Sequence, residues 1–108
     1  LLPGAEHLAV TPVTVATGLQ HPWAVAFLPD GRFLVTERPG RLRVVSADGR
    51  LGAPVAGLPR AAAGGQGGLL DVVADSAFAD NRRIYLCYSE PSADGRANST
   101  ALGSAVTK

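Results

Sequence analysis

The residues best suited to chemistry form a short stretch in the middle of the chain, where one glutamine stands among four glycines. The stretch is Gly64-Gly65-Gln66-Gly67-Gly68, and it leads directly into the apolar residues 69–74. Glycine reaches positive φ values and lets a ligand approach the backbone closely, while the apolar run anchors the loop to a packed sheet. The pattern predicts a loop that presents one amide side chain to a ligand.

Phosphate binding is the first alternative for a glycine-rich loop. The dinucleotide fingerprint G-x-G-x-x-G opens a helix, and here Leu70 stands where its third glycine would be. No P-loop lysine follows, and residues 84–88 are β-branched and aromatic, which favours a strand. Nucleotide binding is therefore disfavoured. The remaining alternative is a flexible connection with an incidental glutamine.

Composition limits the class of protein and its partners. The chain has 108 residues, 46% of them hydrophobic, and a formal net charge of +1, which fits one small globular domain. Without runs of like charge, neither nucleic acid nor anionic lipid is expected as a partner. No apolar run approaches the roughly 20 residues of a membrane span. Cys87 is the one cysteine, so no internal disulfide can form, and we expect a buried structural thiol.

The N-terminal residues lack the basic and long apolar regions of a signal peptide. Methionine is absent from the chain. We therefore expect a piece that was cut or processed from a longer protein.

Strand and turn signals alternate along the chain and predict an all-β fold. We expect strands near residues 23–28, 32–37, 41–46 and 53–58, with turns at Asp30-Gly31, Pro39-Gly40 and Asp48-Gly49 between them. Residues 13–16 form a further β-branched segment. No segment has a convincing helical pattern.

The same order then restarts, with strands expected at 69–74 and 83–89 and with Asp80-Asn81 in place of the Asp-Gly turn. The offset of roughly 45 to 50 residues is the period of four-stranded propeller blades. We therefore predict a β-propeller, with a first blade at about 13–58 and part of a second at about 66–108. A two-sheet sandwich is the alternative architecture.

Three motifs together resemble the opening of the soluble quinoprotein sugar dehydrogenases, the family of the aldose sugar, glucose and sorbosone dehydrogenases. They are GLQHPWAVAFLPDG at residues 18–31, LVTERPGRL at 34–42 and GQGGLLD at 65–71. They occur in the family's order and spacing, and the resemblance runs from about Val13 to the end of the chain. The second and third motifs together are the most specific part.

The resemblance implies a six-bladed β-propeller that binds pyrroloquinoline quinone (PQQ) and Ca²⁺. Such an enzyme oxidises the anomeric hydroxyl of an aldose to a lactone, and hydride passes to the quinone. The family's active-site glutamine matches Gln66, which Gly65 and Gly67 flank. The general-base histidine, the groups that hold the quinone and the calcium ligands belong to later blades. We therefore expect neither a catalytic residue nor a metal ligand within these 108 residues, and no turnover by this piece alone.

The resemblance also implies an aldose substrate, an electron acceptor and a periplasmic or secreted location, and it is compatible with a homodimeric parent. Two other functions stay open at this point. One is a non-catalytic propeller module that binds a protein or glycan, and the other is a propeller hydrolase acting on sugar lactones.

Strand direction predicts which residues share an edge with Gln66. In a meander, the loop after the second strand and the loop joining two blades emerge on the same edge. This expectation places His21, Glu37 and Arg38 near Gln66. Glu37 and Arg38 form either a pair on the cofactor face or an exposed local ion pair. We interpret His21 as a hydrogen-bonding residue rather than a ligand, and Trp23 as core packing.

One further motif is independent of the fold. Asn98-Ser99-Thr100 matches a glycosylation sequon, which matters only for a secreted eukaryotic protein.

Overall fold

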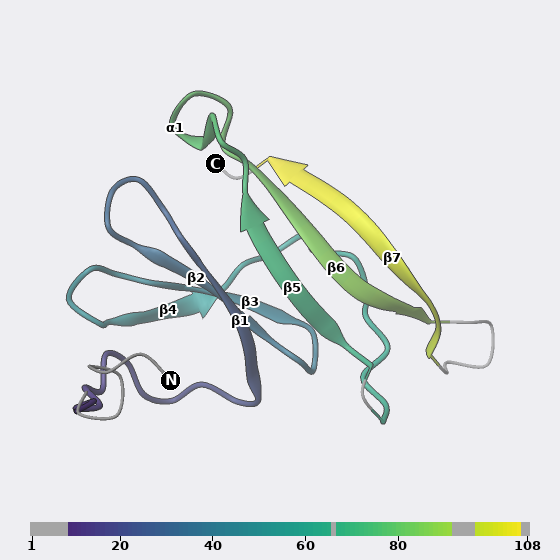
Figure 1. Ribbon diagram of the computed structural model, residues 1–108. Coiled ribbons are helices and arrows are strands. Elements are labelled where there is room, and N and C mark those ends of the chain that lie inside the picture. The colour runs from purple at the N-terminus through teal and green to yellow at the C-terminus, as the bar shows by residue number, and fades with distance from the viewer. Residues whose placement is uncertain (1–8, 66, 92–96, 107–108) are drawn as a thin grey trace, which may run out of the picture.

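A computed structural model describes residues 9–65, 67–91 and 97–106, the last range by its backbone only (Figure 1). The described chain forms two antiparallel sheets with strand orders β1-β2-β3-β4 and β5-β6-β7. The first sheet contains β1 (Pro22–Phe27), β2 (Phe33–Glu37), β3 (Arg41–Val45) and β4 (Leu51–Pro54). The second contains β5 (Leu69–Ala74), β6 (Arg83–Pro91) and β7 (Ala97–Val106). Each strand pairs with its neighbour in sequence, so the expected meander is confirmed in both sheets.

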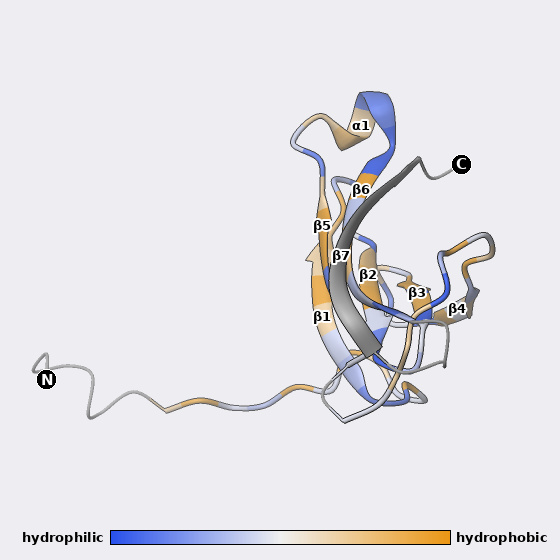
Figure 2. Cartoon of the chain, turned by 90° about the vertical axis from the view of Figure 1, so that its right-hand side faces the viewer, coloured by the Kyte–Doolittle hydropathy of each residue, from blue (hydrophilic) through white to orange (hydrophobic). Residues whose placement is uncertain are grey.

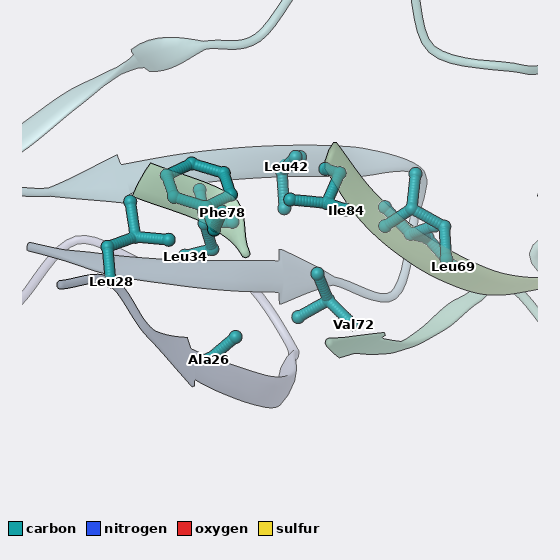
Figure 3. Close-up of a cluster of buried hydrophobic side chains, with 9 residues drawn as sticks. Ala26, Leu28, Leu34, Leu42, Leu69, Val72, Phe78 and Ile84 are labelled. Atoms are coloured by element: carbon teal, nitrogen blue, oxygen red, sulfur yellow. The ribbon is translucent and has the colours of Figure 1, made fainter. Parts of the chain in front are cut away.

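The hydrophobic core lies between the two sheets. In the first sheet Ala26 pairs with Leu34, and strand alternation places their side chains on the face that β5 covers. Figure 3 shows side chains from both sheets pointing toward one another. The buried cluster consists of Ala26, Leu28, Leu34, Leu42, Leu69, Val72, Phe78, Ile84 and Leu86.

The opposite face of β1 is apolar but open. Trp23, Val25 and Phe27 are 56%, 51% and 72% exposed, and Figure 2 shows β1 on the outer side of the molecule. The prediction that Trp23 packs in the core is therefore wrong. The alternation of β1 turns the small side chains of Ala24 and Ala26 inward, and the large ones outward.

Strand β4 begins and ends earlier than predicted. The turn that precedes it is tight, with Ser46 N–H donating to Arg50 O at 2.9 Å and Gly49 at φ 89°. The chain therefore re-enters the sheet at Leu51. It leaves soon after Pro54, which has no N–H to donate, and Gly57 then takes a φ of 83°.

Residues 13–16 do not form the expected strand. Val13 is 78% exposed, and the Val15 backbone lies against Gly49 in the turn between β3 and β4 rather than in a sheet. Within the described residues this segment lies beside no strand with which it pairs, so its β-branched composition alone does not fix its conformation.

A single helical turn, α1 (Phe78–Asn81), replaces the tight turn expected at Asp80-Asn81. It joins β5 to β6 and buries the Phe78 side chain against the core. Arg82 ends it in the left-handed conformation, with φ 55°. Among the described residues, no helix has both the length and the apolar character required to cross a membrane.

Candidate functional site

Three loops meet at one edge of the two sheets. They are the approach to β1, the β2–β3 turn and the connection leading into β5. Arg38 N–H donates to His21 O at 2.9 Å, and Leu69 N–H donates to Arg38 O at 2.9 Å. The connection into β5 lies at the opposite end of that strand from α1 (Figure 1). The predicted common edge is thus confirmed.

The Arg38 side chain reaches the glycine loop. Its Nη1 donates to the carbonyl oxygen of Gly65. It does not pair with Glu37, so the predicted pairing of these two residues is wrong. The two side chains leave the end of β2 on different sides, because successive residues of an extended chain alternate.

Glu37 is instead a buried carboxylate at the end of β2, with a side chain that is 0% exposed. Its Oε1 accepts hydrogen bonds from Arg41 Nε at 2.9 Å and Arg43 Nη1 at 3.2 Å, and its Oε2 accepts one from Gln20 N–H. Arg41 Nη2 also donates to Gln20 Oε1 at 2.8 Å. This cluster fixes the approach to β1 on the β2–β3 hairpin.

Two opposing effects act on the pKa of Glu37. Burial by itself raises the pKa of the carboxyl, because it penalises the charged form. The hydrogen bonds from Gln20 N–H, Arg41 and Arg43 outweigh it, so the pKa of Glu37 lies below its ordinary value. The carboxylate is therefore ionised at neutral pH.

The glycines have two different environments. Gly64 and Gly65 are exposed, with open space where a side chain would begin, and Gly65 has φ 56°. A Cβ on Gly67 would lie 3.0 Å from both Ala62 O and Ser89 Oγ, and one on Gly68 would lie 2.2 Å from Arg38 O. The second half of the loop therefore requires glycine for close packing, whereas the first half faces open space. Gln66 lies outside the described residues, and its position at the site stays a prediction.

Thr36 is a buried residue that the sequence did not single out. Its Oγ1 accepts from Ala24 N–H at 3.0 Å and donates to Leu70 O at 2.5 Å. It thereby ties β1, β2 and β5 together directly beneath the loops. The available signal was a hydroxyl on the inward face of β2, where a polar side chain needs buried partners.

His21 supplies a backbone contact, through the carbonyl that accepts from Arg38, and its side chain is exposed. Its φ of 46° shows that the chain bends sharply before β1. The described part of the chain contains no group of three or more His, Cys, Asp or Glu side chains that could hold a metal ion. Cys87 is a free thiol and is only partly buried, rather than buried as predicted.

The chain is similar in sequence to known sugar dehydrogenases. The model of the glucose/sorbosone dehydrogenase family matches residues 19–108. The aldose sugar dehydrogenase YliI of Escherichia coli K12 is 55% identical over 86 residues, which are 79% of this chain and 23% of that protein.

Solved structures agree with this match. The apo-form of the soluble aldose sugar dehydrogenase of Escherichia coli superposes with a TM-score of 0.74 at 52% identity, covering 82% of this chain and 25% of that one. The PQQ-bound form of the aldose sugar dehydrogenase of Streptomyces coelicolor gives 0.72 at 30% identity, covering 83% and 25%. The chain therefore spans about a quarter of the length of these relatives.

The structural matches also settle the architecture. The two sheets are a first blade and part of a second in an all-β propeller, as the repeated turn spacing predicted. From the family match over residues 19–108 and the two superpositions, the chain belongs to the glucose/sorbosone dehydrogenase family.

Proposed function

We propose that this chain is part of a dehydrogenase that oxidises the anomeric hydroxyl of an aldose to a lactone, with PQQ as the hydride acceptor. Support comes from the aldose sugar dehydrogenases among its relatives and from a PQQ-bound structure at 30% identity. The observation that carries the proposal is the joining of three loops through Arg38, which brings the glycine loop to a shared propeller edge.

The residues at this edge fit an anionic cofactor such as PQQ, which carries carboxylates. Arg38 supplies one guanidinium group beside the glycine loop, whereas Arg41 and Arg43 are paired with the buried Glu37. Gly64 and Gly65 leave open space beside this positive charge. The open half of the glycine loop would therefore border the bound group, and Arg38 would hold that loop without contacting the group. The group would supply a two-electron acceptor for hydride.

Calcium does not fit the described part of the chain in the same way. The described residues offer no cluster of carboxylates, whereas Ca²⁺ takes six to eight oxygen ligands in proteins. We therefore assign no Ca²⁺ ligand to the described residues, and we propose, on the family resemblance, that later blades of the parent protein supply the ligands.

Within this scheme the chain's own residues bind and orient the sugar. We propose that the Gln66 amide hydrogen-bonds a sugar hydroxyl, and that Gly64 and Gly65, which face open space, allow the ring to approach the backbone. Thr36 and Arg38 hold the loop in register with β2. A periplasmic or secreted location and a separate electron acceptor complete the proposal on the family resemblance.

The test is Gln66→Ala in the full-length protein reconstituted with PQQ and Ca²⁺. A lost hydrogen bond of about 0.5 to 1.5 kcal/mol predicts a roughly two- to tenfold fall in kcat/KM for aldose oxidation with a dye acceptor. The melting temperature of the apo-protein should not change, because the side chain leaves a glycine loop rather than the core. Ser76→Ala, exposed beside α1 at the other edge, is the matched control.

Three results would contradict the proposal. Unchanged kinetics in Gln66→Ala would remove this residue from the site, and a large loss of apo-protein stability would make its role structural. Absence of aldose oxidation by the reconstituted wild type would instead favour a non-catalytic binding module.

A further inference from the structure

Arg38 contacts all three loops of the shared edge. Its backbone N–H bonds the carbonyl of His21 before β1, and its own carbonyl accepts from Leu69 N–H at the start of β5. Its guanidinium then extends to the carbonyl of Gly65. One residue at the end of β2 thereby links the approach to the first blade with the entry to the second.

The stem of Arg38 lies against the second half of the glycine loop. A Cβ placed on Gly68 would be 2.7 Å from Arg38 Cγ, and Gly68 is buried. Ser89 N–H holds the same half of the loop from β6 by donating to Gly68 O at 2.8 Å. Gly68 is therefore fixed from two sides, by β6 and by the Arg38 stem.

The first half of the loop is held differently. Gly64 and Gly65 are exposed, and nothing lies within 4 Å of the position of a Cβ on either of them. The Gly65 carbonyl is reached from outside the loop by the Arg38 guanidinium. The Gly64 carbonyl has a partner within the loop, because it accepts from Gly67 N–H at 2.7 Å. Glycine loses more conformational freedom on ordering than any other residue, so the Arg38 contact is the hydrogen bond that restrains Gly65 from outside the loop. A charge-assisted hydrogen bond is the stronger kind of partner.

We infer that Arg38 is a positioning residue, which fixes the Gly65 carbonyl and with it the open first half of the glycine loop. The inference rests on the proposed role of Gln66 in binding the aldose. In this inference Arg38 acts on the aldose site through the glycine loop and does not contact the cofactor directly.

The variant that isolates the guanidinium is Arg38→Met in the full-length holoenzyme, since methionine keeps the stem against Gly68 and removes the donors. We expect kcat/KM for the aldose to fall roughly three- to tenfold, with partial recovery in Arg38→Lys. Binding of PQQ to the apo-protein should be unchanged. Amide hydrogen exchange in a peptide covering residues 62–70 should become faster.

Arg32→Met is the matched control, because Arg32 forms an exposed ion pair with Asp30 at the opposite edge. It removes one guanidinium and should alter neither the exchange of residues 62–70 nor kcat/KM. Should Arg38→Met fail to fold, Arg38→Gln, which is shorter and neutral but keeps Cγ, is measured in the same way and carries the same expectation.

A double-mutant cycle with Gln66→Ala separates positioning from direct action. If Arg38 acts through Gln66, adding Arg38→Met to Gln66→Ala should lower kcat/KM less than twofold further. Fully additive losses, weakened PQQ binding or unchanged exchange in residues 62–70 would each overturn the inference. A different result would separate this inference from the proposed function. If Arg38→Met makes exchange in residues 62–70 faster but Gln66→Ala leaves kcat/KM unchanged, the contact between Arg38 and Gly65 is supported and the proposed role of Gln66 is contradicted.

Discussion

Glu37 shows how one side chain can fix an edge of the sheet. Its carboxylate is fully buried, yet both oxygens have donors, from a backbone amide and from two arginines that are 36% and 16% exposed. A buried charge is tolerated only when its partners replace the lost water. The same arginines would lose their counter-charge if the carboxylate were removed, so the stability of each member of the cluster depends on the others.

Glu37→Gln should therefore destabilise the full-length apo-protein by about 3 kcal/mol, because it leaves two partly buried guanidinium groups uncompensated. The pKa of Glu37 is lowered on folding, so its stabilisation is present above the unfolded pKa of about 4.3 and is lost as pH falls through the folded value. The difference between wild type and variant, measured by denaturant unfolding, should shrink in acid. Glu90→Gln, exposed on β6, is the control. Equal stabilities at pH 7 would show that the cluster contributes nothing net.

The partners of Glu37 could not be read from its neighbours in sequence. The Glu-Arg dipeptide at 37–38 suggested a local pair, but the strand register places Glu37 opposite Arg41. The Glu37 side chain therefore contacts Arg41, whereas the Arg38 side chain extends to Gly65. A cross-strand partner follows from register, and register depends on the turn that connects the strands.

At the scale of elements, the turn residues made most strands predictable. The Asp30-Gly31 and Pro39-Gly40 signals bound β2 closely, and the apolar run after Gly68 gave β5 at its observed limits. The strand predictions were wrong where contacts with distant parts of the chain determine whether a segment joins a sheet. Residues 13–16 have strand composition but no paired strand, and β4 follows its tight turn rather than the apolar residues 55–58.

The β5–β6 connection is organised by one carboxylate, Asp75. Its Oδ2 accepts from Ala77 N–H at 3.0 Å and Asn81 Nδ2 at 2.9 Å, and its Oδ1 accepts from Tyr85 OH at 2.6 Å. These bonds, led by that from Tyr85, lower the pKa of Asp75 to about 2, and the same contact raises the pKa of Tyr85. A local network of this kind explains why a helical turn forms in a segment without a helical pattern.

Asp75 should contribute to acid stability in a defined pH window. Its folded pKa of about 2 lies below the unfolded value, which is about 3.9. Its contribution is therefore present above about pH 4 and is lost as pH falls toward 2. We expect Asp75→Asn to destabilise the full-length protein at neutral pH. Its free energy of unfolding should also fall less steeply than that of the wild type between about pH 4 and about pH 2, which is the acid limb of the stability curve. Asp80→Asn, exposed on α1, should leave the limb unchanged. An identical limb in Asp75→Asn would contradict the network.

At the scale of the whole molecule, the two sheets cover only one face of each other. The radius of gyration is 16.2 Å, whereas about 13 Å is typical of a compact domain of this length. The first described residues, which include the exposed Val10, contribute to this extension by lying away from the sheets (Figure 2). Propeller blades bury their faces against neighbours on both sides, and the outer face of β1 has no such neighbour among the described residues.

A polypeptide of residues 1–108 alone should therefore associate or fail to unfold cooperatively. The outer face of β1 presents Trp23, Val25 and Phe27, and β5 presents Val73. Within the described residues, the outermost strands of both sheets also have unpaired edges. Apolar faces and open strand edges of this kind promote association. Size-exclusion chromatography with a denaturant melt measures both properties. The double variant Val25→Lys, Phe27→Lys places charge on the exposed face and should reduce association without restoring a cooperative transition, because the missing neighbour is not replaced. A monodisperse monomer with a sharp transition in the unsubstituted polypeptide would show that the core between the two sheets is sufficient by itself.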